Sequence, residues 1–104
     1  MAPSLTENAF SKQLNTKFRV SLGDSLVDLE LVEVKSYLSK QKEHEGMERF
    51  SLYFQGPAEP HLPQQLYAFN HDQMGEFNIF IVPIGKNDAG FRYEAVFNLF
   101  KSAD

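Results

Sequence analysis

The sequence predicts a mainly β protein: a compact antiparallel barrel or two-layer sandwich of about six strands, with a short N-terminal helix. Two observations lead to this fold class. Apolar residues mostly recur with the alternation of strands, and turn-forming Gly, Pro, Asn and Asp interrupt them about every dozen residues. Helical periodicity is confined to the start of the chain. The choice between barrel and sandwich stays open at this point.

The length of 104 residues is that of one domain, so we expect a single domain over 1–104, with a helix at about 5–14 and a β core at about 16–100. A chain of this size buries roughly 65% of its unfolded surface, which is enough to fold without covalent staples. The sequence contains no cysteine, which excludes disulfides, thiolate metal sites and a thiol nucleophile.

Charge and hydropathy narrow the range of partners. The net charge is −4 and the ten Lys and Arg residues are scattered, whereas binding to a phosphate backbone needs clustered basic residues. The first eight residues lack the basic start and apolar run of a secretion signal, and no apolar window is long enough to span a membrane. We therefore expect a cytoplasmic protein that binds neither nucleic acid nor membrane.

Residues 5–14 fit a short amphipathic helix. Ser4 and Glu7 have the spacing of a capping box, and Phe10 and Leu14 share one helical face. A helix this short is marginal alone, so it must pack its apolar face on something else. We expect that face to cover an open end of the sheet.

Two predicted strands follow, joined by a turn at Gly23–Ser25. Lys17–Leu22 alternates polar and apolar residues, as a half-buried strand does. The second strand, 26–35, changes phase at Leu31–Val32, because its apolar residues move from one face to the other. A β-bulge, or a bend from one layer into another, would explain this change.

The middle of the chain is polar and then rich in proline. Residues 38–49 are charged and aperiodic, which predicts an exposed hairpin connection. A strand at 49–55 ends at Gly56–Pro57. The three prolines between 57 and 63 cannot donate ladder hydrogen bonds, so we expect an extended and ordered arm rather than a strand. A short strand at 65–70 and a turn follow.

The most apolar stretch is Phe77–Ile84, in which only Asn78 is polar. This composition predicts a strand buried on both faces. Pro83 cannot donate to a ladder, so the last residues of the strand should lie at an edge, a bulge or the strand's end. The final strand, 91–100, is predicted to pair with this one across a glycine-bounded loop.

Short motifs after residue 50 occur in a recognisable order: FSLYFQGP at 50–57, LPQQ at 62–65, GEF at 75–77, FIVP at 80–83 and YEAVFN at 93–98. In these motifs the chain resembles a small bacterial all-β domain family of unknown function, over roughly residues 10–98. The resemblance implies a stand-alone β domain whose relatives accompany phage-tail-like proteins. It implies no catalytic residue, because the family has no assigned activity.

No pattern predicts a metal, a cofactor or a catalytic centre. His71, Asp72 and Glu76 come nearest to a metal cluster, but such residues are ordinary in turns. Asp28 and Glu30 are neighbours on one strand, whereas paired catalytic carboxylates face each other across a cleft. The sequence contains neither a nucleophile elbow nor a phosphate-binding glycine loop.

The segment 57–67 is the best candidate for a contact surface. Its prolines stiffen the backbone, and a stiff loop loses little conformational entropy on binding. The alternative is that the prolines only protect a strand edge from pairing. The candidate binding residues are Pro60, His61, Gln64, Gln65 and Tyr67.

Two functions remain in view. The favoured one is a non-enzymatic protein-interaction or assembly module whose partner is another protein, with its oligomeric state left open. The alternative is a small hydrolase or ligand-binding barrel that uses Glu94, Asp72 or His71 at an open barrel end. That alternative predicts a concave pocket with convergent polar groups.

Overall fold

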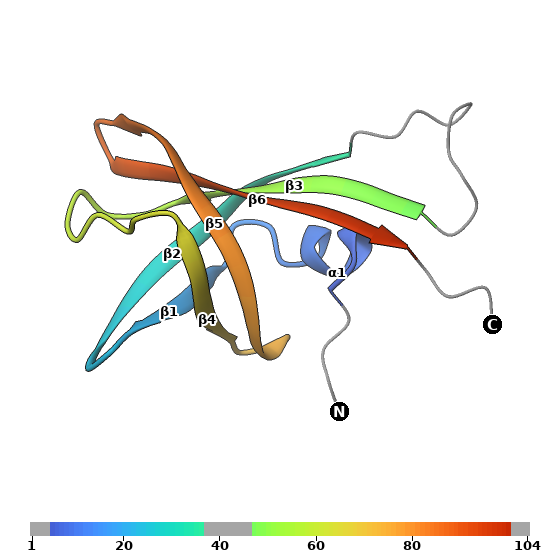
Figure 1. Cartoon of the computed structure of the whole chain (residues 1–104), viewed down its shortest axis with the longest axis horizontal. Coiled ribbons are helices and arrows are strands. Elements are labelled where there is room, and N and C mark those ends of the chain that lie inside the picture. Colours follow the sequence, from blue (N-terminus) through green and yellow to red (C-terminus); the bar gives the residue numbers. More distant parts are fainter. Residues whose placement is uncertain (1–4, 37–46, 101–104) are drawn as a thin grey trace.

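The computed structural model describes residues 5–36 and 47–100, and its elements follow the predicted order (Figure 1). All strand pairings are antiparallel. The structure confirms the mainly β class with six strands and a short N-terminal helix. The elements are α1 (Glu7–Ser11), β1 (Lys17–Leu22), β2 (Ser25–Ser36), β3 (Met47–Gln55), β4 (Gln65–His71), β5 (Gly75–Asn87) and β6 (Gly90–Phe100).

The strands form one sheet that closes on itself in the order β1-β2-β3-β6-β5-β4, with β4 returning to β1. The closing seam is short, because β1 and β4 pair only at Arg19 with Asn70 and at Val20 with Phe69. Of the two closures left open by the sequence, the structure therefore shows a single ring of strands.

Two long strands, β2 and β5, change their pairing partner along their length. β2 pairs with β1 from Ser25 to Glu30 and with β3 from Glu30 onward, with a register shift between Leu31 and Glu33. The register shift confirms the irregularity that the sequence predicted at Leu31–Val32. β5 pairs with β4 in its first half and with β6 in its second half, with a register shift between Pro83 and Gly85. Pro83 thus lies at a bulge, as its missing donor requires.

The interior of the ring is filled by aromatic and aliphatic side chains. Phe10 of α1 is fully buried and contacts the rings of four other phenylalanines from different strands, which confirms that the helix covers an open end of the sheet. The helix is shorter than predicted. Its N-cap is Thr6, whose side chain accepts the Ala9 N–H at 3.1 Å, and Leu14 is exposed beyond the helix. The partners of Phe10 are Phe18, Phe50, Phe77 and Phe97.

The prediction for Phe77–Ile84 was wrong in one respect, because β5 is buried on only one face. Phe77, Ile79 and Ile81 point into the core, whereas Asn78 and Phe80 are exposed. The physical reason is the closure of the sheet: a ring has a single interior, so each strand has one inner and one outer face. Nothing in the described part of the chain packs over the outer face of β5. The predicted connection at 38–49 lies mostly outside the described residues, and β3 begins at Met47.

Candidate functional site

The segment Gly56–Gln64, which we call the proline arm, joins β3 to β4 along the surface of the ring. Among its predicted binding residues Pro60, His61 and Gln64 are exposed, and so is Gln65 at the start of β4. Tyr67 is buried, and its hydroxyl donates a hydrogen bond to the Pro63 carbonyl at 2.7 Å. Tyr67 therefore supports the arm from beneath, while the other four face solvent.

The arm is ordered because the ring holds it at both ends. The Gly56 N–H donates to the Phe91 carbonyl at 2.8 Å, and the Leu62 N–H donates to the Tyr93 hydroxyl at 3.0 Å. Leu62 is buried, whereas its neighbours His61 and Pro63 are exposed. The arm forms no strand, as expected, but it bends at residues 58–60 instead of running extended. It is fixed by residues of β6 and not by its prolines alone.

Close packing at the base of the arm explains two of the glycines. A Cβ at Gly56 would lie 2.6 Å from a methyl carbon of Leu29. A Cβ at Gly90, where φ is 137°, would collide with the backbone of Gly56 and Pro57. The arm and the start of β6 therefore approach each other more closely than any side chain allows.

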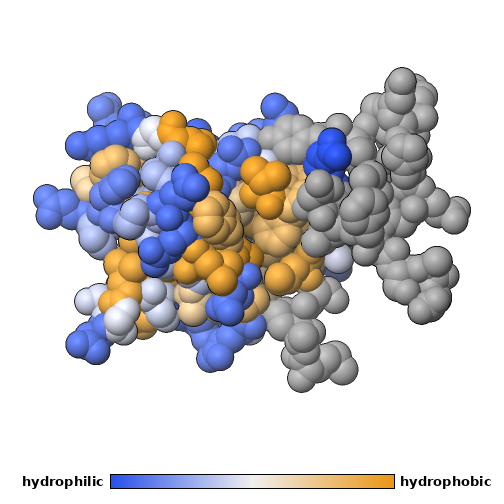
Figure 2. All heavy atoms as spheres, viewed as in Figure 1, coloured by the Kyte–Doolittle hydropathy of each residue, from blue (hydrophilic) through white to orange (hydrophobic). Residues whose placement is uncertain are grey.

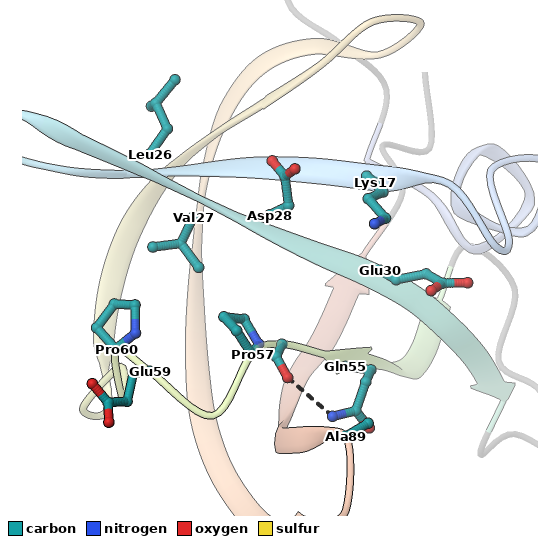
Figure 3. A pocket seen from close by; sticks show the side chains of 11 residues that line it. Lys17, Leu26, Val27, Asp28, Glu30, Gln55, Pro57, Glu59, Pro60 and Ala89 are labelled. Atoms are coloured by element: carbon teal, nitrogen blue, oxygen red, sulfur yellow. Dashed lines mark hydrogen bonds between the residues drawn. The ribbon is translucent and has the colours of Figure 1, made fainter.

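A surface groove of about 420 Å³ runs between the arm and β2 (Figure 3). Figure 3 shows Pro57 and Pro60 on the arm side and Val27 on the β2 side. Asp28 and Glu30 also line the groove, so the carboxylate pair noted in the sequence lies at its wall. Lys17, Gln55, Glu59 and Ala89 contribute to the remaining lining. Among the predicted binding residues, Pro60 alone lines this groove.

An apolar surface lies on the outer faces of β4, β5 and β6. Leu66 is 58% exposed, Phe80 47% and Val96 63%. Leu66 and Phe80 are direct partners across the β4–β5 ladder, so their side chains are neighbours. Hydrophobic atoms also gather over the middle of the face shown in Figure 2, where β5 crosses β6 in Figure 1. We call Leu66, Phe80 and Val96 the apolar face.

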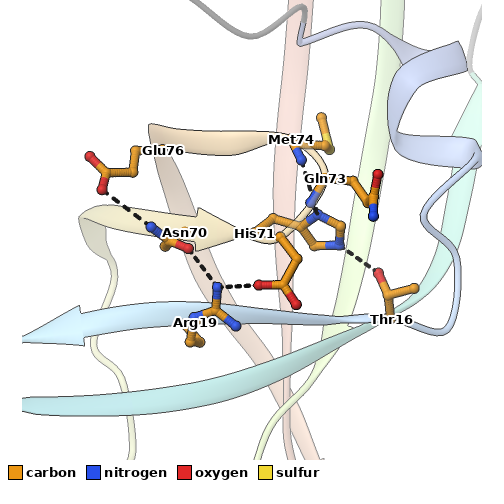
Figure 4. A network of polar contacts seen from close by, with 8 residues as sticks. Thr16, Arg19, Asn70, His71, Gln73, Met74 and Glu76 are labelled. Carbon is orange, nitrogen blue, oxygen red and sulfur yellow. Dashed lines mark hydrogen bonds and ion pairs between the residues drawn. The ribbon is translucent and has the colours of Figure 1, made fainter.

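His71 is the centre of a polar network at the β4–β5 turn (Figure 4). Its Nδ1 accepts the backbone N–H groups of Gln73 and Met74 at 3.0 and 3.2 Å, which places the proton of the neutral ring on Nε2. Nε2 lies 2.8 Å from the Thr16 hydroxyl, which in turn donates to the Gln13 carbonyl at 2.7 Å. Both ring nitrogens are thus engaged in holding the turn against the end of α1.

The charged residues next to His71 also stabilise the fold. Arg19 donates to Asn70 at 2.6 Å and to Asp72 at 2.7 Å, and so ties β1 to β4 at the seam of the ring. The hydrogen bond and charge of Arg19 hold the pKa of Asp72 below its ordinary value. Burial lowers the pKa of His71, so the ring is neutral at pH 7.

Glu94 lies on the outer face of β6, far from this network. Its carboxylate accepts hydrogen bonds from Ser51 at 2.7 Å and from Tyr53 at 3.2 Å. Glu94 pairs with Val82 of β5, whereas His71 pairs with Gly75 of the same strand. The seven residue steps from Gly75 to Val82 span about 23 Å of strand. The structure therefore does not bring together the three side chains named for a hydrolase.

Within the described residues, no group of three or more His, Asp or Glu side chains is placed to hold a metal ion. The one helix in that part of the chain is too short to cross a bilayer.

Sequence reasoning missed the apolar face. It assigned Phe80 to the core because the apolar run of β5 hides the alternation that separates inner from outer residues. Val96 shares a face of its strand with the polar residues Arg92 and Glu94. That pattern could have identified it as an apolar residue that points outward.

Comparison with known proteins gives one match. The model of a family described as a domain of unknown function (DUF6916) matches residues 5–97. No match was found among curated proteins or among solved structures. The matched region contains α1, the whole proline arm and all six strands except the last residues of β6. Because this region covers most of the chain, the protein belongs to the DUF6916 family of domains of unknown function.

Proposed function

We propose that this domain is a protein-interaction module that binds its partner through the apolar face. The supporting observation is the exposure of Leu66 and Phe80, which are cross-strand partners on β4 and β5, and of Val96 on the outer face of β6. Single exposed apolar residues are ordinary on a protein surface, but contiguous ones typically mark an interaction site.

The proline arm extends this surface. Gln64 and Gln65 directly precede Leu66 in the chain and are exposed, so they lie at the rim of the apolar face. A polar rim around an apolar centre is the usual anatomy of a protein–protein interface. In this arrangement Tyr67 holds the rim in place through its hydrogen bond to Pro63.

A hydrolase has less support, because its proposed residues lie apart from one another and already take part in hydrogen bonds or ion pairs. His71 uses both ring nitrogens in local hydrogen bonds, and Asp72 is paired with Arg19 at the surface. A general base must reach the proton that it abstracts, and it must share a pocket with its partners. We therefore retain the interaction module. The motif resemblance to a family whose members accompany phage-tail-like proteins supports a phage-tail-like protein as its partner class.

Photo-crosslinking in the native host tests this proposal. p-Benzoylphenylalanine is placed at position 80, and at position 26 as the matched control, because Leu26 is 64% exposed but lies beside the groove on β2. We expect one protein to be crosslinked from position 80 and not from position 26. The purified partner should then bind the wild-type chain, and Phe80→Lys should weaken that binding at least tenfold, while Leu26→Lys leaves it unchanged. Equal crosslinking from both positions, or equal affinity of both variants, would contradict the proposal.

A further inference from the structure

β5 and β6 pair only between Val82/Glu94 and Asn87/Gly90, and they separate beyond Val82. We call the separated parts, Gly75–Ile81 of β5 and Ala95–Phe100 of β6, the fork. In the described chain no strand pairing joins the two sides of the fork. Each side instead pairs with its other neighbour, β4 or β3.

The β5 side of the fork is an unpaired strand edge. Successive residues of an antiparallel strand turn their N–H and C=O groups to opposite neighbours. Every second residue of Gly75–Ile81 therefore directs its backbone donor and acceptor into the fork, along about 23 Å of strand. Exposed residues line this stretch at Gly75, Glu76, Asn78 and Phe80. Such an edge is a template for another strand.

The core is closed behind the fork by α1, not by strand pairing. The ring of Phe10 lies 5.9 Å from that of Phe77 on β5 and 5.5 Å from that of Phe97 on β6. Phe10 therefore bridges the two diverging strands from inside. An added strand would therefore meet a core that Phe10 already closes.

The side chains at the fork indicate the composition of the strand that fits. Phe80 and Val96 project outward from its two sides and are both exposed. Glu76 is exposed at the wide end, whereas the carboxylate of Glu94, at the narrow end, is engaged by Ser51 and Tyr53 of β3. An incoming strand thus meets apolar contacts in the middle and negative charge at the wide end.

We propose that the β5 edge of the fork receives an extended segment of the partner protein as an added strand, with alternating apolar residues and a basic residue opposite Glu76. This inference rests on the proposed function and specifies how the partner binds. Backbone hydrogen bonds to β5 supply the pairing, and contacts with Phe80 and Val96 select apolar side chains.

A second copy of this chain is the less suitable occupant. Two copies that met at the fork would bring the exposed Glu76 of each molecule into one interface, and the whole chain carries a net charge of −4. A standard stable interface buries roughly 800 Å² on each partner, and three exposed apolar side chains supply only part of that area. A basic extended segment avoids the charge repulsion, and it does not depend on the large apolar area that a stable dimer needs.

The test uses a phage-displayed library of random dodecapeptides, selected on the immobilised full chain. The strongest binder is synthesised unmodified, and again with N-methyl groups on either of the two alternating sets of its amides. Affinities are measured by calorimetry with the wild-type chain, with Val96→Lys, and with Leu26→Lys. The two replaced side chains are almost equally exposed, at 63% and 64%, but only Val96 borders the fork.

Strand addition predicts that one N-methylated set loses at least tenfold in affinity while the other set binds nearly as the parent does. It also predicts slower hydrogen exchange in Gly75–Ile81 on binding, and a loss of affinity with Val96→Lys alone. Equal effects of the two N-methyl sets would overturn strand addition, yet a loss with Val96→Lys would still support the apolar face. Selection of no binder, a peptide insensitive to Val96→Lys, or a dimer that protects the same amides without peptide would also overturn the inference. Crosslinking from position 80 decides the proposed function separately.

Discussion

The hydroxyl of Tyr93 accepts a hydrogen bond from the backbone N–H of Leu62 at 3.0 Å, inside the protein. Tyr93 is fully buried on the inner face of β6, and burial raises the pKa of its hydroxyl. The bond ties the proline arm to the strand that carries the apolar face. The order of the arm therefore depends on a core residue about thirty positions further along the chain.

The substitution Tyr93→Phe should leave the Leu62 N–H buried without an acceptor. We expect a loss of about 1–3 kcal/mol in the free energy of unfolding, the usual cost of an unsatisfied buried donor. Urea denaturation measures this loss, and hydrogen exchange should show faster exchange in the arm than in β3. Tyr67→Phe is the control, because it removes the bond to the Pro63 carbonyl and leaves the Leu62 bond intact. Unchanged stability and exchange in Tyr93→Phe would show that the arm is held by other contacts.

Gly90 should tolerate no side chain. Its φ of 137° is strained for any other residue, at a cost of roughly 1–3 kcal/mol, and a Cβ would also collide with the arm backbone. Gly90→Ala is therefore expected to lower the melting temperature strongly. Gly85→Ala in the same hairpin is the matched control, because a Cβ there meets no atom within 4 Å. Similar melting temperatures for the two variants would contradict the close approach of arm and strand.

Phe10 should contribute more to stability than any other residue of α1. Phe10→Ala removes a ring that touches four other phenylalanines, and large-to-small changes of this kind cost about 3–5 kcal/mol. Leu14→Ala, at an exposed position just beyond the helix, should cost less than about 1 kcal/mol. Chemical denaturation of both variants tests this difference. Equal losses would instead support the longer helix, with Phe10 and Leu14 on one buried face, that the sequence predicted.

Much of the fold follows from residues that act locally. Alternation located the strands, and the phase change at Leu31–Val32 located a bulge, because one inserted residue moves every later side chain to the other face. Pro83 located the second irregularity through its missing donor. These features need only neighbouring residues to be understood.

Features that depend on distant partners could not be predicted. The alternation of β5 is hidden because its outer residues Phe80 and Ile84 are as apolar as its inner ones. The short pairing of β1 with β4 decides that the sheet closes, and no local pattern encodes it. The fork, likewise, exists only because β5 changes its neighbour at Val82.

His71 should make the stability of the protein depend on pH. Burial lowers its pKa, and the charge of Asp72 opposes this effect only in part. The unfolded chain therefore binds a proton near the ordinary value of 6.5, at a pH where the folded chain still resists protonation. The contribution of neutral His71 is fully present above about pH 6.5 and decreases as the pH falls from there toward the lower pKa of the folded state.

Protonation of Nδ1 would also set a donor against the N–H groups of Gln73 and Met74, so the turn before β5 should open with the same pH dependence. Urea denaturation between pH 8 and pH 4.5 measures the effect, with His71→Gln as the variant that should flatten the curve. The contribution of Asp72 falls outside this pH range: Arg19 lowers the pKa of Asp72, so its share of stability is lost only below the ordinary value of 3.8. A wild-type chain whose unfolding free energy stays constant from pH 7.5 to pH 5 would show that the buried ring accepts a proton as readily as an exposed one.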